Sequence, residues 1–284
     1  MASFSMFVLP VTLLAQAVFA VPAPQGVPNT SPTSTTSSSP SYATIPAGCP
    51  TAATGNLVCY QCDTSFPSDD TWLSWECLAA LNRQTMVKGN DGTVDGPNEA
   101  DDVLNAIQVT AQAANIDSRI ILAQMMQESV GFVRAGEGDN GASYGLFQVQ
   151  LPPGVAANCD GTAVNTCPYS TILEMVQDGV FGHAGTSTPQ APGLGYWMTA
   201  EGGDVARALR GYNTGSVIDP NDLCDIVATN PSTGKKYFAG TQTYVSDVAN
   251  RLTGANAGLA HNYSCNLDID PDTYVPASCP AARL

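Results

Sequence analysis

The segment from Ser118 to Val130 constrains the fold of this chain more than any other. It reads SRIILAQMMQESV, and Asp117 precedes it at the position where a helix is typically capped. Most of its side chains are apolar, and the exceptions before its last turn are Arg119, Gln124 and Gln127. A helix that is apolar around most of its circumference has to be covered on several sides by other elements. We therefore expect a central, buried helix here.

Helical periodicity dominates elsewhere too, whereas alternating strand patterns are scarce. In the segment Asn98–Ala114, Asn98 can act as the cap and an acidic first turn precedes apolar residues at helical spacing. Asp70–Asn82 begins with acidic residues and carries an aromatic face at Trp72 and Trp75. Three more helices are expected at Ser170–Val180, Asp204–Tyr212 and Thr241–Leu252. These helices predict an all-α (mainly α) domain. The connections are long and rich in Gly, Pro, Asn and Cys, which predicts irregular loops tied by disulfides.

The N-terminal region differs in composition from the rest. Met6–Phe19 is an apolar run that ends in the small-x-small pattern Val18-Phe19-Ala20, which is suited to signal peptidase. We interpret residues 1–20 as the cleaved signal peptide of a secreted, extracellular protein; an uncleaved anchor is the alternative, since no Lys or Arg precedes the run. Residues 21–47 are rich in Ser, Thr and Pro, which predicts an extended, O-glycosylated linker. Residues 48–284 are long enough for one domain, with a Cys-rich N-terminal extension over about 48–90.

All nine cysteines lie in the predicted domain: Cys49, Cys59, Cys62, Cys77, Cys159, Cys167, Cys224, Cys265 and Cys279. In a secreted chain they are expected to form disulfides, with one left over. Cys159 and Cys167 are close enough to tie one loop, whereas the other pairings cannot be read from the sequence. The spacing Cys59-x-x-Cys62 leaves zinc or redox chemistry open as the alternative. The chain also contains two N-glycosylation sequons, Asn29-Thr30-Ser31 and Asn262-Tyr263-Ser264.

The net charge of −15 limits the classes of partner. Nucleic acid and anionic membranes are not attracted to an acidic surface, so neither is expected as a partner. His183 and His261 are lone histidines without the spacing of metal ligands, and no cofactor is implied. We expect a monomer.

Glu128 is the candidate catalytic residue of the buried helix. It lies seven residues after Ile121 and three after Met125, so the three side chains share one helix face. A carboxyl group at the end of an apolar face is desolvated, which favours its protonated form. A general acid needs that form near neutral pH. The alternative is that Glu128 only marks the point where the helix emerges into water.

Two further blocks follow this carboxylate. Glu128-Ser129 is followed by Tyr144-Gly145-Leu146-Phe147-Gln148-Val149-Gln150, and much later by Gly211-Tyr212-Asn213-Thr214-Gly215. The order Glu-Ser, Gly-Leu-(Met/Phe)-Gln and Tyr-Asn-x-Gly resembles the soluble lytic transglycosylases and goose-type lysozymes, from about Ala100 to Ser216. The resemblance implies a lysozyme-like helical domain and an enzyme that cleaves peptidoglycan.

The first two blocks receive their roles from this resemblance. Glu128 matches the single catalytic acid, which protonates the leaving oxygen. Ser129 is expected to orient Glu128 or to contact sugar. Gly145, Leu146 and Gln148 match the block that lines the cleft, where Gln148 can hydrogen-bond the glycan and Gly145 permits a close approach of the backbone.

The third block matches the pair that faces the acid. Tyr212 and Asn213 correspond to that pair, and the Tyr212 hydroxyl can hydrogen-bond Glu128. The alternative is that the segment from Tyr212 to Gly215 is simply a helix C-cap, where Asn and Gly are favoured.

A second carboxylate decides between hydrolysis and transglycosylation. An inverting hydrolase needs a base that activates water on the opposite face of the sugar. The goose-type pattern has one Asp six residues before the block's glycine and another just past the block; Asp139 occupies the first position here and Gln150 the second. Gln150 can hold water but cannot take its proton. A lytic transglycosylase needs no water, because the sugar's own 6-hydroxyl attacks and leaves a 1,6-anhydro end. Both reactions stay open, and Asp139 is alternatively only a turn residue.

Other residues are weaker candidates. Glu137, Glu174 and Asp178 are expected to be solvated, with a place for Asp178-Gly179 at the border of the cleft as the alternative. The pairs Tyr196-Trp197 and Trp72 with Trp75 are expected in the core, with a role as sugar-stacking platforms as the alternative. We predict a secreted enzyme that cleaves the β-1,4 bond between N-acetylmuramic acid and N-acetylglucosamine in peptidoglycan. A hydrolase of chitin-type N-acetylglucosamine polymers and a glycan-binding protein without turnover are the alternatives. Because bacterial wall glycan is anionic, the cleft should differ in charge from the surface as a whole, or activity should favour low pH.

Overall fold

The computed structural model describes residues 42–52, 56–88, 94–136, 138, 143–150, 157–183, 192–255 and 270–272. The chain divides into two units, Met1–Ser38 and Ser39–Leu284, and every described residue belongs to the second. The predicted signal peptide and most of the predicted linker therefore lie outside the described residues. Within the described part of the chain, no helix is long and apolar enough to cross a membrane.

The described residues are mainly helical, which confirms the predicted fold class. They contain seven α-helices: α1 (Trp75–Lys88), α2 (Pro97–Ala114), α3 (Ser118–Ser129), α4 (Tyr169–Phe181), α5 (Leu194–Ala200), α6 (Val205–Thr214) and α7 (Tyr244–Leu252). Two short 3-10 helices precede them, η1 (Asp63–Ser65) and η2 (Asp69–Thr71). The strands form two antiparallel pairs, β1 (Ser143–Tyr144) with β2 (Val149–Gln150) and β3 (Val227–Thr229) with β4 (Lys236–Phe238).

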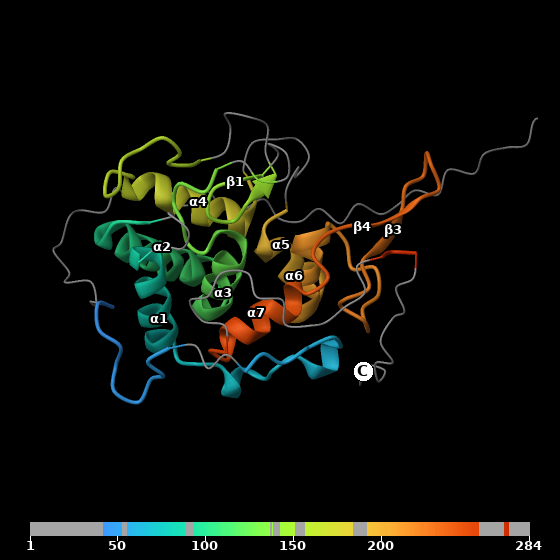
Figure 1. The fold of residues 1–284 in the computed structure, drawn as a ribbon, viewed down its shortest axis with the longest axis horizontal. Coiled ribbons are helices and arrows are strands. Elements are labelled where there is room, and N and C mark those ends of the chain that lie inside the picture. The colour runs from blue at the N-terminus through green and yellow to red at the C-terminus, as the bar shows by residue number, and fades with distance from the viewer. Residues whose placement is uncertain are drawn as a thin grey trace, which may run out of the picture. The chain divides into compact units, whose positions relative to one another are not determined.

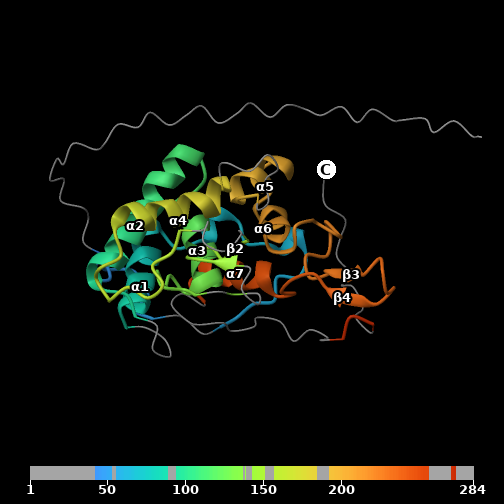
Figure 2. The same cartoon turned by 90° about the horizontal axis from the view of Figure 1, so that it is seen from above.

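Helix α3 is the buried helix that the sequence predicts. Every residue from Ile120 to Gln127 is buried, and α3 packs against α1, α2 and α7 (Figures 1 and 2). Asp117 caps it, since its side chain accepts a hydrogen bond of 2.8 Å from the backbone N–H of Arg119. At the other end Val130 adopts a left-handed conformation with φ of 56°, which ends the helix one residue after Ser129.

The helices around α3 close a ring of contacts. Helix α2 packs on α4, α4 on α5, α5 on α6, α6 on α7, and both α7 and α2 pack on α3. Helix α1 covers α2 and α3 from outside this ring. Two of these contacts, α2 with α4 and α3 with α7, join helices that are not neighbours in the sequence, so they bring distant segments together.

Two predicted helices begin later than expected, because tertiary hydrogen bonds hold the preceding residues in other conformations. Helix α1 begins at Trp75 rather than Asp70: the N–H of Leu73 donates to the carbonyl of Leu252 (2.9 Å), which keeps that stretch out of the helix. Helix α7 begins at Tyr244 rather than Thr241. There the guanidinium group of Arg210 bonds the carbonyls of Thr241 (3.0 Å) and Gln242 (2.9 Å).

The cap of α2 also differs from the prediction. Gly96, not Asn98, is the N-cap, and Pro97 is the first helical residue. The Glu99 carboxylate accepts a hydrogen bond of 2.8 Å from the N–H of Gly96. Proline is favoured at this position because its missing N–H would be unsatisfied there in any case. The sequence analysis did not predict α5, a helix of 7 residues between α4 and α6.

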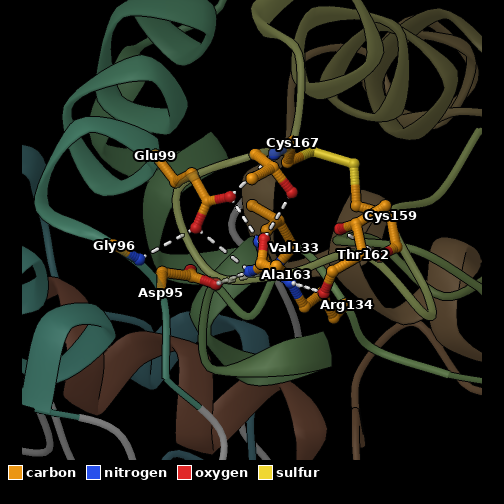
Figure 3. Close-up of polar contacts among 10 residues, drawn as sticks. Asp95, Gly96, Glu99, Val133, Arg134, Cys159, Thr162, Ala163 and Cys167 are labelled. Carbon is orange, nitrogen blue, oxygen red and sulfur yellow. Dashed lines mark hydrogen bonds and ion pairs between the residues drawn. A yellow bond between two sulfur atoms is a disulfide. The ribbon is translucent and has the colours of Figure 1, made fainter.

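A buried ionic cluster joins α2 to the loop before α4. Arg134 bonds both carboxylate oxygens of Glu99 and lies 3.5 Å from Asp95 (Figure 3). It also donates to the backbone carbonyls of Thr162 and Ala163. All three charged side chains are at most 8% exposed. One cation therefore holds two carboxylates and one loop in the interior.

Disulfides tie the irregular segments, as predicted. Cys159 and Cys167 are joined beside the ionic cluster (Figure 3), and Cys49 is joined to Cys77 at the start of α1. Cys59 and Cys62 are also disulfide-bonded, so they do not present free thiolates. Among the described cysteines Cys224 is free, and it is buried.

Candidate functional site

Four helices of the ring line a pocket of about 240 Å³. Its described lining residues come from α3, the β1–β2 hairpin, α4, α5, α6 and the loop before α7: Glu128, Ser143, Gln148, Val149, Gln150, Asp178, Pro192, Trp197, Tyr212, Asn213, Thr214, Gly215 and Ala239. The three sequence blocks thus meet in one place, although they are separated by many residues in the chain. Each block contributes described lining residues, but Ser129, Gly145 and Leu146 are not among them.

Glu128 lies where α3 ends and lines this pocket. Ile121 and Met125, on the same helix face, are fully buried, as the spacing predicted. Its carboxylate accepts a hydrogen bond from the hydroxyl of Tyr244, the first residue of α7. Burial and the Glu128 charge raise the pKa of Tyr244 well above its ordinary value, so this phenol stays protonated and remains a donor. One oxygen of the carboxylate is thereby held in a fixed direction.

The partner of Glu128 differs from the one that the resemblance implied. The Tyr212 hydroxyl donates to the backbone carbonyl of Phe147 (2.9 Å), whereas Tyr244 donates to Glu128. Tyr212 still lines the pocket, and its pKa lies well above the ordinary value because of burial and the charges of Glu128 and Asp178. Tyr212 therefore joins α6 to the hairpin close to both carboxylates.

Tyr244 was missed in the sequence analysis. It belongs to a helix that was predicted, but no motif marks it, and it is 116 residues away from Glu128. Only the packing of α7 against α3 brings the two side chains together.

Ser129 and Leu146 support the site from behind rather than lining it. The Ser129 hydroxyl donates to the carbonyl of Leu146 (2.8 Å) and accepts from the N–H of Gly131 (3.2 Å). Leu146 is fully buried in the core, and neither residue is among the described lining residues. Leu146 was expected to line the cleft and Ser129 to orient Glu128 or to contact sugar. In the structure, the two residues link the end of α3 to the hairpin turn.

Gly145 is required for packing against the protein itself. Its φ is +68°, and a Cβ atom placed there would lie 2.9 Å from the carbonyl oxygen of Ala157 and 3.1 Å from the sulfur of Met175. The close approach expected at this glycine is therefore made by the segment before α4 and by α4. Gln148 does line the pocket, and its amide nitrogen donates to the carbonyl of Gly145 (3.0 Å) across the turn.

Asn213 lines the pocket while it anchors the loop before α7. Its Oδ1 accepts from the N–H of Thr241 (2.9 Å) and from Arg210 (2.9 Å). Because both partners are donors, the amide oxygen faces them, and no acceptor from the described residues bonds the amide N–H groups. The next residues end α6, with Gly215 left-handed at the cap (φ 72°). The C-cap interpretation and the site interpretation of this block are therefore compatible.

The structure supplies one second carboxylate in the pocket, Asp178. Asp139 lies outside the described residues, so its predicted role stays a prediction. Gln150 is exposed at the pocket. Asp178, in α4, is buried and lines the pocket, so the expectation that it is solvated is wrong and the alternative, a place at the border of the cleft, holds. Its Oδ1 lies 3.2 Å from Nδ1 of His183. The pKa of Asp178 lies above its ordinary value, mainly because of burial. The contact with His183 opposes this rise, and the charge of Glu174 adds to it.

One of the candidate aromatic platforms belongs to the pocket. Trp197 lines it and packs on Gly211, where a Cβ atom would lie 2.2 Å from the indole ring. Tyr196 is 49% exposed beside it. Trp72 packs against the guanidinium group of Arg119, and Trp75 donates to the hydroxyl of Tyr42. Neither tryptophan is among the described lining residues of this pocket.

The described lining residues include two carboxylates and no Lys, Arg or His. Within the described part of the chain, no group of His, Cys, Asp and Glu could hold a metal ion. The arrangement suits proton transfer between carboxyl groups and a polar, uncharged ligand. Comparison of the chain with protein-family models, with curated proteins and with solved structures found no match.

Proposed function

We propose that the protein is an extracellular glycosidase that cleaves the β-1,4 bond between N-acetylmuramic acid and N-acetylglucosamine in peptidoglycan. The observation that carries the proposal is the carboxyl group of Glu128, held by the Tyr244 hydroxyl at the end of a buried helix and open to the pocket. The resemblance of the three blocks to the soluble lytic transglycosylases and goose-type lysozymes supports the choice of substrate. The disulfides support an extracellular location.

Glu128 acts as the general acid in this proposal. It donates its proton to the glycosidic oxygen while the bond to the anomeric carbon breaks. Tyr244 positions one carboxyl oxygen of this side chain, which lines the pocket. Trp197 offers an aromatic wall, and the amide N–H groups of Asn213 are donors for the acetamido or hydroxyl groups of the glycan.

The test is the substitution Glu128→Gln, which keeps the size and polarity of the side chain but removes its acidic proton. We expect the release of soluble fragments from purified peptidoglycan to fall by a factor of about 100 or more. Binding to insoluble peptidoglycan and the melting temperature serve as controls and should stay close to those of the wild type. Full activity in this variant would contradict the proposal, and binding without release in the wild type would favour a glycan-binding protein.

An uncharged polymer of N-acetylglucosamine is the second candidate substrate. It is favoured by the absence of a cationic side chain among the described lining residues and by the net charge of −15. Turnover of chitin oligomers, with no release from bacterial walls at any pH between 4 and 8, would identify this substrate.

A further inference from the structure

Two carboxylates from different helices face the same pocket. Glu128 comes from the end of α3 and Asp178 from α4, two helices that α2 joins within the ring. Tyr212 lies near both, since the charges of both carboxylates raise the pKa of its hydroxyl. The pocket between them is larger than one water molecule, at about 240 Å³. A sugar ring with a water beside it can therefore contact both groups.

The surroundings of the two carboxylates differ in kind. Glu128 is bonded by the neutral hydroxyl of Tyr244, whereas Asp178 is bonded by the imidazole of His183 at 3.2 Å. Burial raises the pKa of Asp178 above its ordinary value and His183 opposes that rise, so the ionised carboxylate is a stronger proton acceptor than an exposed one. Two carboxylates in unlike environments divide the roles of acid and base between them.

Asp178 is also placed as an accessible base. Its side chain is 12% exposed, and within the described residues only His183 bonds its carboxylate, through Oδ1. Among these residues none bonds Oδ2, which is the atom we assign to the attacking water. Gln150, which lines the same pocket, cannot accept a proton.

We propose that Asp178, oriented by His183, is the base that activates the attacking water, so that the enzyme hydrolyses the glycosidic bond. The inference rests on the proposed function and goes beyond it by assigning the class of reaction. The water oxygen bonds to the anomeric carbon as the glycosidic C–O bond breaks. Asp178 takes a proton from the water, and the leaving oxygen takes the proton of Glu128. One water is added across the bond, and a reducing end is formed.

The first experiment uses the unmodified protein. A base that activates water on the face opposite the leaving group inverts the anomeric carbon. We expect proton NMR of soluble glycan oligomers, recorded in the first minutes of digestion, to show the α-anomer of the new reducing end. Mass spectrometry should show reducing ends. A product that consists of 1,6-anhydro ends, or of the β-anomer, would overturn the inference while leaving the cleavage activity in place.

The second experiment removes the base. Asp178→Asn should lower the formation of reducing ends by a factor of about 100 or more. In Asp178→Ala, added azide should restore cleavage with a glycosyl azide as product, because azide attacks without giving up a proton. The matched control is Glu174→Gln, which removes an exposed carboxylate one turn earlier on α4 and should change the rate by less than about twofold.

These outcomes separate the two proposals. Wild-type hydrolysis in Asp178→Asn, or a folded Asp178→Ala variant that azide does not rescue, would overturn the role of Asp178 alone. Loss of activity in Asp178→Asn that azide reverses in Asp178→Ala supports it, because a merely structural role would not respond to azide. Full activity in Glu128→Gln would overturn the proposed function and the inference together.

Discussion

The two carboxylates of the buried ionic cluster have pKa values that are shifted in opposite directions, so their substitution should change the stability in opposite directions. Arg134 is one cation beside two acids, so it can neutralise only one of them. Glu99 receives both Arg134 bonds and the N–H groups of Gly96 and Cys167. Burial opposes its ionised form, but these donors lower the pKa of Glu99 to about 2. Asp95 receives less help, and burial raises its pKa to about 7.

The perturbation is Asp95→Asn, which imitates the protonated acid at every pH. The folded state holds the Asp95 proton up to about pH 7, whereas the unfolded chain releases it near the ordinary value of 3.8. Stability therefore falls as the pH rises through this window. Ionisation of the folded carboxyl costs up to about 4 kcal/mol at ~1.36 kcal/mol per unit. The amide of the variant has one N–H group without an acceptor, which costs about 1 kcal/mol and offsets part of this gain.

We expect Asp95→Asn to be more stable than the wild type by roughly 3 kcal/mol at pH 8 and nearly equal to it at pH 4. For a domain of this size the gain is a rise in melting temperature of about 6–12 °C at pH 8. Circular dichroism melting curves at the two pH values measure it. A melting temperature at pH 8 that is equal to or lower than that of the wild type would refute the division of charge between Asp95 and Glu99.

Glu99→Gln is the matched control in the same cluster. It leaves the Arg134 charge buried without its main partner, which costs about 3–5 kcal/mol at neutral pH. Because the folded pKa of Glu99 is depressed, its contribution is present above about pH 4.5 and is lost as the pH falls towards about 2. The two isosteric substitutions therefore shift the melting temperature at pH 8 in opposite directions.

Three further substitutions test the site and its supports. Tyr244→Phe should lower kcat on peptidoglycan by about 10- to 100-fold, since a hydrogen bond to a charged group contributes about 1.5–3 kcal/mol; wild-type kcat would exclude Tyr244 as the residue that positions Glu128. Gly145→Ala should destabilise the fold by about 1–3 kcal/mol in a denaturant titration, because of its positive φ and the contact with Ala157. An unchanged transition midpoint would contradict that reasoning. Replacing both Cys159 and Cys167 by Ser should cost about 2.5 kcal/mol, and a variant as stable as the wild type would show that the ionic cluster alone holds the loop.

Part of the site was readable because it is local. Glu128 stood out through its place on one helix face with Ile121 and Met125, and the blocks around Gly145 and Tyr212 are contiguous. Asp178 was expected to be solvated, whereas packing buries it in the pocket, and its pairing with His183 follows from the turn that ends α4. The predicted helices are all present, but α1 starts five residues and ends six residues later than the predicted segment Asp70–Asn82.

The errors share a physical cause. The starts of α1 and α7 depend on hydrogen bonds to Leu252 and from Arg210, which come from distant parts of the chain. The cap of α2 depends on Glu99, whose position is set by Arg134. Local propensity contains none of these partners, so it misplaces the ends of elements while it identifies the elements themselves.

A helical domain built around the segment Ser118–Val130 can be predicted from the sequence alone, because apolar periodicity is a local property and an apolar helix has to be covered by other elements. The same segment shows a carboxylate in the last turn of that helix. The tertiary structure decided the partners of the carboxylate: Tyr244 bonds Glu128, Tyr212 bonds the hairpin, and Asp178 faces the same pocket. These contacts depend on how the ring of helices closes, and closure is a property of packing between distant segments that no single segment contains.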